Sequence, residues 1–361
     1  MIVEFLKLQN FRNFNLAELH FSSDAVFFEG GNGQGKTSLL EALFFLANLR
    51  SFRTLKLNDL KRIGSPSFHL SLILRRPQGW KSVLEADAGQ VRTLTVDRVP
   101  VNKASDFTGK IKTVAFLPDD PLIVSGPSNL RRRFFDMFIS MLDRSYFTAL
   151  QNYGHALRSR NFLLKNRQDE PDILSSYSAV LAAAGSEIVL KRRQYAVLLE
   201  GLMKKLFEEL CPVLAGFQIR MHFTRETEDR ESYFQKLERD VRKDLLRGAV
   251  SCGPHLDDFD FLFDDKPMRS FGSRGQCRMT SLILKLAELE AVRQTSGALQ
   301  DTVVLVDDAT ADLDIRAREA FLEKIRQAGQ TFFAFTEIPP EFQLEKCDKF
   351  KIKAGTVEKQ E

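Results

Sequence analysis

The alternation of hydrophobic and polar residues predicts β-structure at the start of the chain. Apolar and polar residues partly alternate in IVEFLKLQNF (residues 2–11) and FNLAELHFS (residues 14–22), and the two polar residues between these runs predict a hairpin turn. A short apolar run over residues 25–28 predicts a buried strand. Residues 37–48 are apolar on almost every side, which is typical of a helix inside the core.

A second group of strands is predicted between residues 68 and 102. In the run FHLSLILRR the large apolar residues occupy alternate positions, so Phe68, Leu70, Leu72 and Leu74 share one face of a strand. The runs WKSVLEA and VRTLTVDRVPVN continue this pattern, with turn-forming residues nearby. We therefore expect an antiparallel β layer beside the first helix.

Helical patterns dominate the middle of the chain, and strand patterns return after it. From about residue 127 to about residue 244 the apolar spacing is that of helices. Short β-prone runs follow at residues 259–263, 302–308 and 331–337. A helix is predicted over residues 314–328, before Gly329.

These patterns predict an α/β protein with two domains. The first domain is built from both ends of the chain, residues 1–125 and 245–361, and the second is an inserted helical arm domain, residues 126–244. The length of 361 residues is sufficient for two domains of ordinary size. The sequence has no internal repeats and no low-complexity tracts.

The composition is that of a globular protein. Hydrophobic residues make up 43% of the chain and charged residues 28%, and the net charge of +4 permits a nucleic-acid partner without indicating one. The four cysteines lack the spacing of metal ligands, so we expect reduced thiols. There is no signal-peptide pattern and no apolar run near the roughly 20 residues of a membrane span, so we expect a cytoplasmic protein with no membrane partner.

A glycine-rich loop joins the third predicted strand to the core helix. Residues 30–37 (GGNGQGKT) fit the pattern G-x-x-x-x-G-K-[ST]. Glycine lets the backbone curl so that successive N–H groups face phosphate oxygens, and the helix N-terminus adds partial positive charge. The strand–loop–helix context favours a nucleotide site over a simple connecting turn. The predicted nucleotide-binding residues here are Gly30, Gly31, Asn32, Gly33, Gln34, Gly35, Lys36, Thr37 and Ser38.

Four side chains, two in this loop and two after a later strand, are expected to carry the chemistry. Lys36 is expected to reach the β- and γ-phosphates, and the Thr37 hydroxyl to ligate Mg²⁺. The run TVVLVDD ends a buried strand on two carboxylates, at the edge where α/β sheets present ligand groups. Asp307 is the second expected Mg²⁺ ligand, and Asp308 is the expected general base for the attacking water.

A second glycine-punctuated loop, SFGSRGQ, precedes an apolar helix after residue 276. Ser273, Gly275 and Gln276 resemble the signature loop of ABC-type ATPases, and DDATADLD resembles the Walker B and D-loop run of that superfamily, with Asp314 as the D-loop aspartate. In that superfamily the signature loop of one head binds ATP held by the phosphate loop of another. The resemblance therefore implies ATP as the ligand, an ABC-type ATPase head as the fold of the first domain, and an ATP-dependent homodimer.

The whole sequence resembles the RecF family of bacterial recombination and replication-repair ATPases. This resemblance implies that Arg12 lies near the nucleotide. The segments that carry it are LKLQNFRNF (6–14), GNGQGKTSLLEAL (31–43), FLPDDPLIVSGPSNLRRRFFD (116–136), GPHLDDFDF (253–261), SRGQCRMTSLILKLAE (273–288) and LVDDATADLD (305–314).

The chain departs from the family pattern at a few positions. Leu256 stands where the family usually has arginine in G-P-H-R-D-D, and Ala311 stands where the D-loop usually has serine. Asp119 stands where glutamate is usual, and Thr336 stands where transporters of the wider superfamily carry histidine. Because the phosphate loop and both carboxylates after the strand are retained, these changes indicate divergence rather than loss of activity.

The predicted arm is rich in basic residues. Residues 125–205 contain thirteen Lys/Arg against seven Asp/Glu, a composition that permits binding to DNA phosphates or a solvated helical surface. The family resemblance favours DNA. The accompanying aromatic residues are expected in the core, and His255 is either a site residue or a structural one. The basic clusters are Arg131–Arg133, Arg158 with Arg160, Lys165 with Arg167, and Lys191–Arg193.

The resemblance implies a weak, DNA-stimulated ATPase in which Lys36, Asp307 and Asp308 are catalytic. ATP binding is expected to close two heads on double-stranded DNA or on gapped and single-stranded junctions, and hydrolysis to release them. RecR and RecO are the expected partners in recombinase loading at single-strand gaps, in the SOS response and in fork recovery.

Three other function classes are less compatible with the sequence. The nucleotide-binding subunit of a transporter has a much shorter insert between the positions of Lys36 and Ser273. A chromosome-structural SMC protein has a long coiled coil, and sustained heptads are lacking here. A scaffold that binds ATP without hydrolysing it does not need the intact pair Asp307 and Asp308.

Overall fold

The computed structural model divides the chain into two compact units, which are described separately. Unit 1 comprises Met1–Pro118 and Val292–Glu361, and unit 2 comprises Asp119–Ala291. The structure describes residues 1–76, 78–166, 170–211, 216–222, 229–296, 302–308, 315–342, 344 and 346–360.

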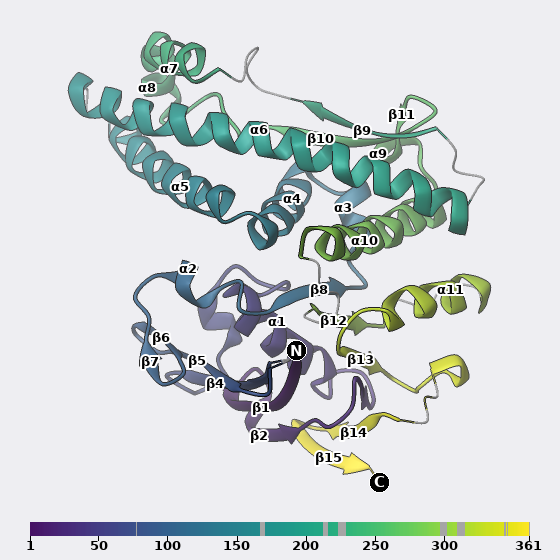
Figure 1. Ribbon diagram of the computed structural model, residues 1–361. Coiled ribbons are helices and arrows are strands. Elements are labelled where there is room, and N and C mark those ends of the chain that lie inside the picture. Colours follow the sequence, from purple (N-terminus) through teal and green to yellow (C-terminus); the bar gives the residue numbers. More distant parts are fainter. Residues whose placement is uncertain are drawn as a thin grey trace. The chain divides into compact units, whose positions relative to one another are not determined.

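The first sheet of unit 1 is antiparallel and has the strand order β2-β1-β4-β5-β6-β7 (Figure 1). The predicted N-terminal hairpin is confirmed as β1 and β2, with Phe11 paired to Phe14 across the turn. Phe68, Leu70, Leu72 and Leu74 are all buried, so the predicted face of β4 is confirmed. The strands are β1 (Ile2–Phe11), β2 (Phe14–His20), β4 (Phe68–Arg75), β5 (Lys81–Ala88), β6 (Arg92–Val96) and β7 (Val99–Pro100).

The second sheet of unit 1 is mostly parallel and has the order β15-β14-β3-β13-β12-β8. β3 lies between β13 and β14 and is parallel to both, whereas β15 is antiparallel to β14. The carboxyl ends of β3 and β12 therefore lie at one edge of the sheet. The strands are β3 (Ala25–Glu29), β8 (Lys112–Phe116), β12 (Thr302–Asp307), β13 (Thr331–Phe335), β14 (Asp348–Lys353) and β15 (Thr356–Gln360).

Helix α1 (Lys36–Asn48) packs between the two sheets of unit 1. It contacts β4 of the antiparallel sheet and β12, β13 and β8 of the mostly parallel sheet. Eleven of its residues are buried, as the sequence predicts for a helix apolar on almost every side. Shorter elements complete the unit: η1 (Leu57–Leu60), α2 (Ala104–Phe107), α11 (Ile315–Arg326) and η4 (Pro340–Phe342).

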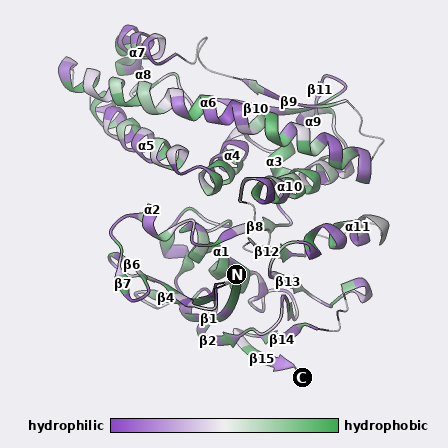
Figure 2. Ribbon diagram, viewed as in Figure 1, coloured by the Kyte–Doolittle hydropathy of each residue, from purple (hydrophilic) through white to green (hydrophobic). Residues whose placement is uncertain are grey.

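Unit 2 combines a helical layer with a three-stranded sheet of order β11-β10-β9. α6 packs on α5 and α7, and hydrophobic and hydrophilic segments alternate along α5 and α6 in Figure 2. The helices are α3 (Pro121–Ser125), α4 (Ser128–Leu142), α5 (Arg144–Lys165), α6 (Pro171–Leu210), α7 (Arg230–Arg239), α8 (Val241–Arg247), α9 (Met268–Phe271) and α10 (Arg274–Ser296). The strands are β9 (Phe217–His222), β10 (Asp258–Phe263) and β11 (Lys266–Pro267).

The compact units do not end where the sequence suggested domain boundaries. Unit 2 begins at Asp119 rather than at residue 126, and it continues through α10 to Ala291 rather than ending at residue 244. β9, inside the region expected to be helical, pairs with β10, which was expected in the other domain. This pairing holds residues 245–263 in unit 2. The assignment of an ATPase head and an arm domain to exact boundaries stays a prediction.

α6 passes a test of length and apolar content for a membrane-spanning helix, although no such segment was expected from the sequence. The test finds one helix of this kind among the described residues, and buried core helices satisfy it too. α6 contacts α5, α7 and β9, and it buries Leu181, Ile188 and Leu199 completely. These contacts place one face of α6 in the core of unit 2, whereas Val180, Leu190 and Val197 are exposed.

Three arginines from the basic clusters are buried in unit 2 and paired with aspartates. Arg160 donates to Asp244 at 2.7 Å, and both side chains are fully buried. Arg131 contacts both carboxylate oxygens of Asp258, and Arg192 donates to Asp136 at 2.7 Å. Because these three arginines are buried, the basic clusters present fewer cations at the surface than their composition suggests. In the same clusters Arg158, Lys165 and Arg193 are exposed, and Arg167 lies outside the described residues.

Candidate functional site

The glycine-rich loop lies where β3 ends and α1 begins, at the carboxyl edge of the parallel strands. Gly35 precedes the helix with φ +123°, which is a conformation that side chains rarely adopt. A Cβ there would lie 2.7 Å from Asn13 Nδ2 and 2.8 Å from the ring of Phe14. The loop can therefore pack against the β1–β2 turn only with glycine at this position.

The Lys36 side chain folds back over this loop. Its Nζ donates to Gly30 O at 2.6 Å and to Gly31 O at 2.8 Å. Burial lowers the pKa of the Lys36 amine from its ordinary value, while the carboxylates of Asp307 and Asp308 oppose that shift. The amine is thus held on backbone carbonyls and can exchange them for the stronger acceptors of a phosphate.

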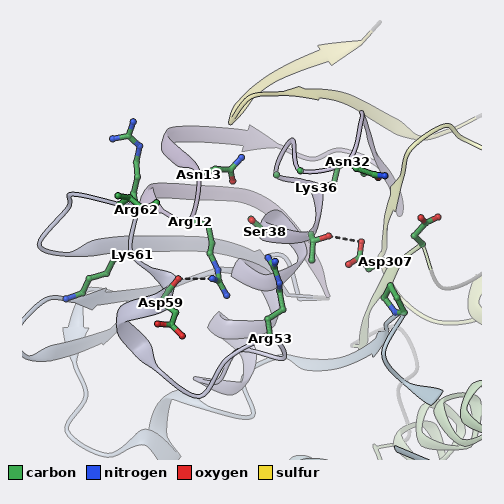
Figure 3. Close-up of a pocket in the computed structure, with 16 residues that line it drawn as sticks. Arg12, Asn13, Asn32, Lys36, Ser38, Arg53, Asp59, Lys61, Arg62 and Asp307 are labelled. Atoms are coloured by element: carbon green, nitrogen blue, oxygen red, sulfur yellow. Dashed lines mark hydrogen bonds between the residues drawn. The ribbon is translucent and has the colours of Figure 1, made fainter. Parts of the chain in front are cut away.

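Thr37 and Asp307 meet although they are 270 positions apart in the sequence. Thr37 Oγ1 donates to Asp307 Oδ1 at 3.1 Å, as the dashed line in Figure 3 shows. Burial raises the pKa of the Asp307 carboxyl, and the neighbouring Asp308 raises it further, whereas the Thr37 hydroxyl and Lys36 lower it. Asp308 is exposed, has φ +49°, and donates its backbone N–H to Ala334 O at 3.1 Å.

These groups border one cavity of about 720 Å³ in unit 1. Cavities of this size are typical of sites for small molecules and nucleotides. Figure 3 shows Asn32 and Asp307 toward one end and Lys61 and Arg62 toward the other. The cavity is lined by Arg12, Asn13, Asn32, Gly33, Gly35, Lys36, Thr37, Ser38, Arg53, Asp59, Lys61, Arg62, Ile63, Pro118, Asp307 and Asp308.

The oxygen atoms at this site suit Mg²⁺. Mg²⁺ prefers hard oxygen ligands and keeps several of its waters, so it is usually held by one or two protein oxygens together with substrate phosphates. Thr37 Oγ1 and Asp307 Oδ1 supply such a pair. Among the described residues there is no group of three or more His, Cys, Asp and Glu that could hold a metal ion.

Three residues of the glycine-rich loop do not line the cavity: Gly30, Gly31 and Gln34. Gln34 instead holds the loop to neighbouring segments of unit 1. Its Oε1 accepts from Ala354 N at 2.6 Å, and its carbonyl accepts from Asn13 Nδ2 at 2.8 Å and Gly355 N at 3.1 Å. The side chain of Gln34 therefore anchors the loop to the β14–β15 turn, while Gly30 and Gly31 supply the carbonyls that hold Lys36.

One side of the cavity is lined by four basic side chains, called the basic wall below, and the sequence motifs indicated only Arg12 among them. Arg53, Lys61 and Arg62 come from the segment between α1 and β4, and Arg12 comes from the turn between β1 and β2. The segment from Arg50 to Arg62 carries five cations and one carboxylate, and that local excess of positive charge is the signal that could have identified it. Arg12, which was expected near the nucleotide, does line the cavity.

The loop that resembles an ABC signature belongs to unit 2. Ser273 and Gln276 cap the start of α10 reciprocally: Gln276 N donates to Ser273 Oγ at 3.2 Å, and Ser273 N donates to Gln276 Oε1 at 2.8 Å. A Cβ at Gly275 would meet nothing within 4 Å, so its backbone is open to an approaching group. Asp314 lies outside the described residues. Binding of nucleotide by these four residues stays a prediction.

His255 is part of a buried polar network in unit 2. Its Nδ1 lies 2.6 Å from the Tyr153 hydroxyl, and Tyr153 lies 3.3 Å from Tyr233. Burial lowers the pKa of His255 to about 4, so it is neutral near pH 7. A Cβ at Gly253 would lie 2.0 Å from the Tyr233 hydroxyl, which shows how closely the chain approaches this network. The contacts of His255 are those of a structural residue.

Comparison with known proteins identifies the family. The sequence model of the AAA ATPase domain matches residues 1–116. The DNA replication and repair protein RecF of Ruminiclostridium cellulolyticum is 31% identical over 348 residues, which cover 93% of each chain. The chain belongs to the RecF family.

Solved structures agree with this assignment. A structure of the recombination mediator protein RecF with ATP, from the RecFOR pathway, is similar with a TM-score of 0.87 and 28% identity, covering 99% of this chain and 97% of that one. An Smc head bound to the C-terminal winged-helix domain of ScpA is similar with a TM-score of 0.55 and 12% identity, over 100% of this chain and 97% of that one. The RecF fold and that of SMC heads therefore share the α/β architecture described above, and the predicted fold class is confirmed.

Proposed function

We propose that this RecF-family protein binds and slowly hydrolyses Mg²⁺-ATP in the cavity of unit 1. The observation that carries the proposal is the convergence of Lys36, Thr37 and Asp307 on one cavity next to a curled glycine loop. The related RecF structure with ATP and the match to an ATPase domain family support ATP as the nucleotide.

Each residue has a defined task in this proposal. The Lys36 amine leaves the carbonyls of Gly30 and Gly31 and binds the β- and γ-phosphates, because charge-assisted hydrogen bonds are stronger than neutral ones. Thr37 and Asp307 hold Mg²⁺, which neutralises phosphate charge when bound. Asp308, exposed at the cavity, orients the attacking water and accepts its proton.

The proposed site is completed by a second copy of the chain. In this arrangement Ser273, Gly275 and Gln276 of one copy meet the γ-phosphate held by the other, and Asp314 lies in the D-loop at the same interface. The open backbone at Gly275 and the start of α10 suit an anion. ATP binding then closes the homodimer, and hydrolysis opens it.

The function of the closed dimer is proposed to be a switch on DNA. Cations such as Arg158 and Lys165, which are exposed on unit 2, are proposed to contact DNA phosphates, so affinity for DNA would fall steeply with salt. DNA is proposed to stimulate the weak hydrolysis. RecR and RecO are proposed as partners in recombinase loading at gaps, in the SOS response and in fork recovery. The related recombination mediator in the RecFOR pathway supports the recombination role.

Replacing Lys36 by alanine tests the nucleotide site. Loss of the amine removes two charge-assisted contacts to phosphate, so the dissociation constant for Mg²⁺-ATP should rise about 100-fold or more. Titration with a fluorescent ATP analogue measures the change. Lys103→Ala, at an exposed lysine of the same unit that does not line the cavity, is the matched control and should bind as the wild type does. Equal affinity of Lys36→Ala and wild type would refute the proposed site.

A further inference from the structure

Glu41 is a fully buried carboxylate in the middle of α1, whose other buried residues after Ser38 are apolar. A buried carboxylate is stable only when hydrogen bonds and opposite charge compensate the loss of water. Glu41 has both. Its position is one and a half turns after Lys36, on the helix that begins at the proposed phosphate site.

The partners of Glu41 come from the wall of the cavity. Arg12 Nε donates to Glu41 Oε2 at 2.7 Å, and Arg12 Nη2 donates to Oε1 at 2.6 Å, which is a two-point contact. The Ser51 hydroxyl donates to Oε1 and accepts from the backbone N–H groups of Arg53 at 2.9 Å and Thr54 at 3.0 Å. The carboxylate therefore joins the phosphate-loop helix to both basic segments of the wall.

The Arg12 guanidinium makes several hydrogen bonds and still has N–H donors without a partner in the described part of the chain. Its Nη1 donates to Asp59 O at 2.7 Å, its backbone N–H donates to Leu60 O at 2.8 Å, and its φ is +54°. A guanidinium has five N–H donors, and three are occupied by partners in the described part of the chain. Two donors remain, on a side chain that lines the cavity.

We propose that Glu41 is a positioning residue that aims the free donors of Arg12 into the cavity and thereby sets nucleotide affinity. This inference rests on the proposed function of the same cavity. Arg53, whose Nη1 lies 3.7 Å from Glu41 Oε2, is held less tightly by the same carboxylate. Without Glu41, the guanidinium of Arg12 loses the acceptor that fixes its plane.

The test is a double-mutant cycle on nucleotide binding. Glu41→Gln replaces one carboxylate oxygen with an NH₂ group, which faces an Arg12 donor and cannot accept from it. We expect Glu41→Gln and Arg12→Ala each to weaken binding of the fluorescent ATP analogue by about tenfold, as for loss of a charge-assisted contact. In the Arg12→Ala background, Glu41→Gln should change the dissociation constant by less than about twofold, because its effect passes through Arg12.

Two controls separate positioning from general destabilisation and from failure of the site itself. Glu18→Gln, which breaks the surface pair with Lys7, should leave affinity unchanged. If Glu41→Gln does not fold, the same cycle is run with Glu41→Asp. The shorter aspartate keeps the charge but moves the carboxylate away from Arg12. Wild-type affinity of a folded Glu41 variant, or a full additional loss in the Arg12→Ala background, would overturn the inference. Equal binding by wild type and Lys36→Ala would instead refute the nucleotide site.

Discussion

Replacing Asp308 by alanine should reduce the rate of ATP hydrolysis by about 10²–10⁴-fold, the range typical for loss of a general base. ATP affinity should change little, because Asp307 and Thr37 hold the metal and Lys36 holds the phosphates in the proposed site. The exposed position of Asp308 at the cavity, one residue beyond the buried Asp307, leaves its carboxylate available to a water molecule.

Phosphate release with and without DNA, together with nucleotide titration, measures both effects. Glu337→Ala is a matched control, because Glu337 is an exposed acid just beyond the end of the neighbouring strand β13 and should keep full activity. If wild type and Asp308→Ala are equally inactive with DNA present, the protein uses ATP only as a structural ligand. Equal, substantial rates would show that another group activates the water.

Replacing Arg160 by alanine should destabilise unit 2 by about 3–5 kcal/mol, the usual cost of breaking a buried ion pair. Arg160 and Asp244 are both fully buried and lie 2.7 Å apart. Asp244 also accepts from Ser251 N at 3.0 Å, and Arg160 donates to Leu237 O at 3.2 Å. Loss of the guanidinium leaves a buried carboxylate without its cation and therefore favours the unfolded chain.

Urea denaturation followed by circular dichroism measures this loss. Arg158→Ala is the matched control, since Arg158 lies two residues away on the same helix and is exposed, so its removal should cost less than about 0.5 kcal/mol. A destabilisation below about 1 kcal/mol for Arg160→Ala would contradict the structural role. A loss of DNA affinity at unchanged stability would show instead that Arg160 contacts DNA.

The features that the sequence predicted well depend on neighbours in the chain. The position of the glycine-rich loop between a strand and a helix follows from local residue types, and the buried face of β4 follows from residues two apart. The core position of α1 follows from its apolar residues, without knowledge of what covers them. Such patterns act over a few residues, so they can be read from one sequence.

The features that the sequence did not predict depend on distant partners. From the sequence alone, Arg131 and Arg160 are compatible with a DNA-binding surface. In the structure they are buried and paired with Asp258 and Asp244, which lie 127 and 84 positions away in the sequence. In the sequence Glu41 is a polar residue in an apolar helix, with no local sign of a function. Its partners Arg12 and Ser51 lie in separate segments of the chain. Likewise, β9 was assigned to a helical region because its partner β10 lies beyond two intervening helices.

We propose that the phosphate loop of one copy and the signature-like loop of another bind the same nucleotide. Sedimentation velocity of wild type and of Ser273→Arg, with Mg²⁺-ATP or Mg²⁺-ADP, tests it most directly. Val197→Arg, on an exposed part of α6, controls for the added charge. The account predicts a dimer with ATP for wild type and Val197→Arg, and monomers with ADP or for Ser273→Arg. A wild-type protein that stays monomeric at high concentration with saturating ATP, or a Ser273→Arg variant that dimerises like wild type, would contradict it.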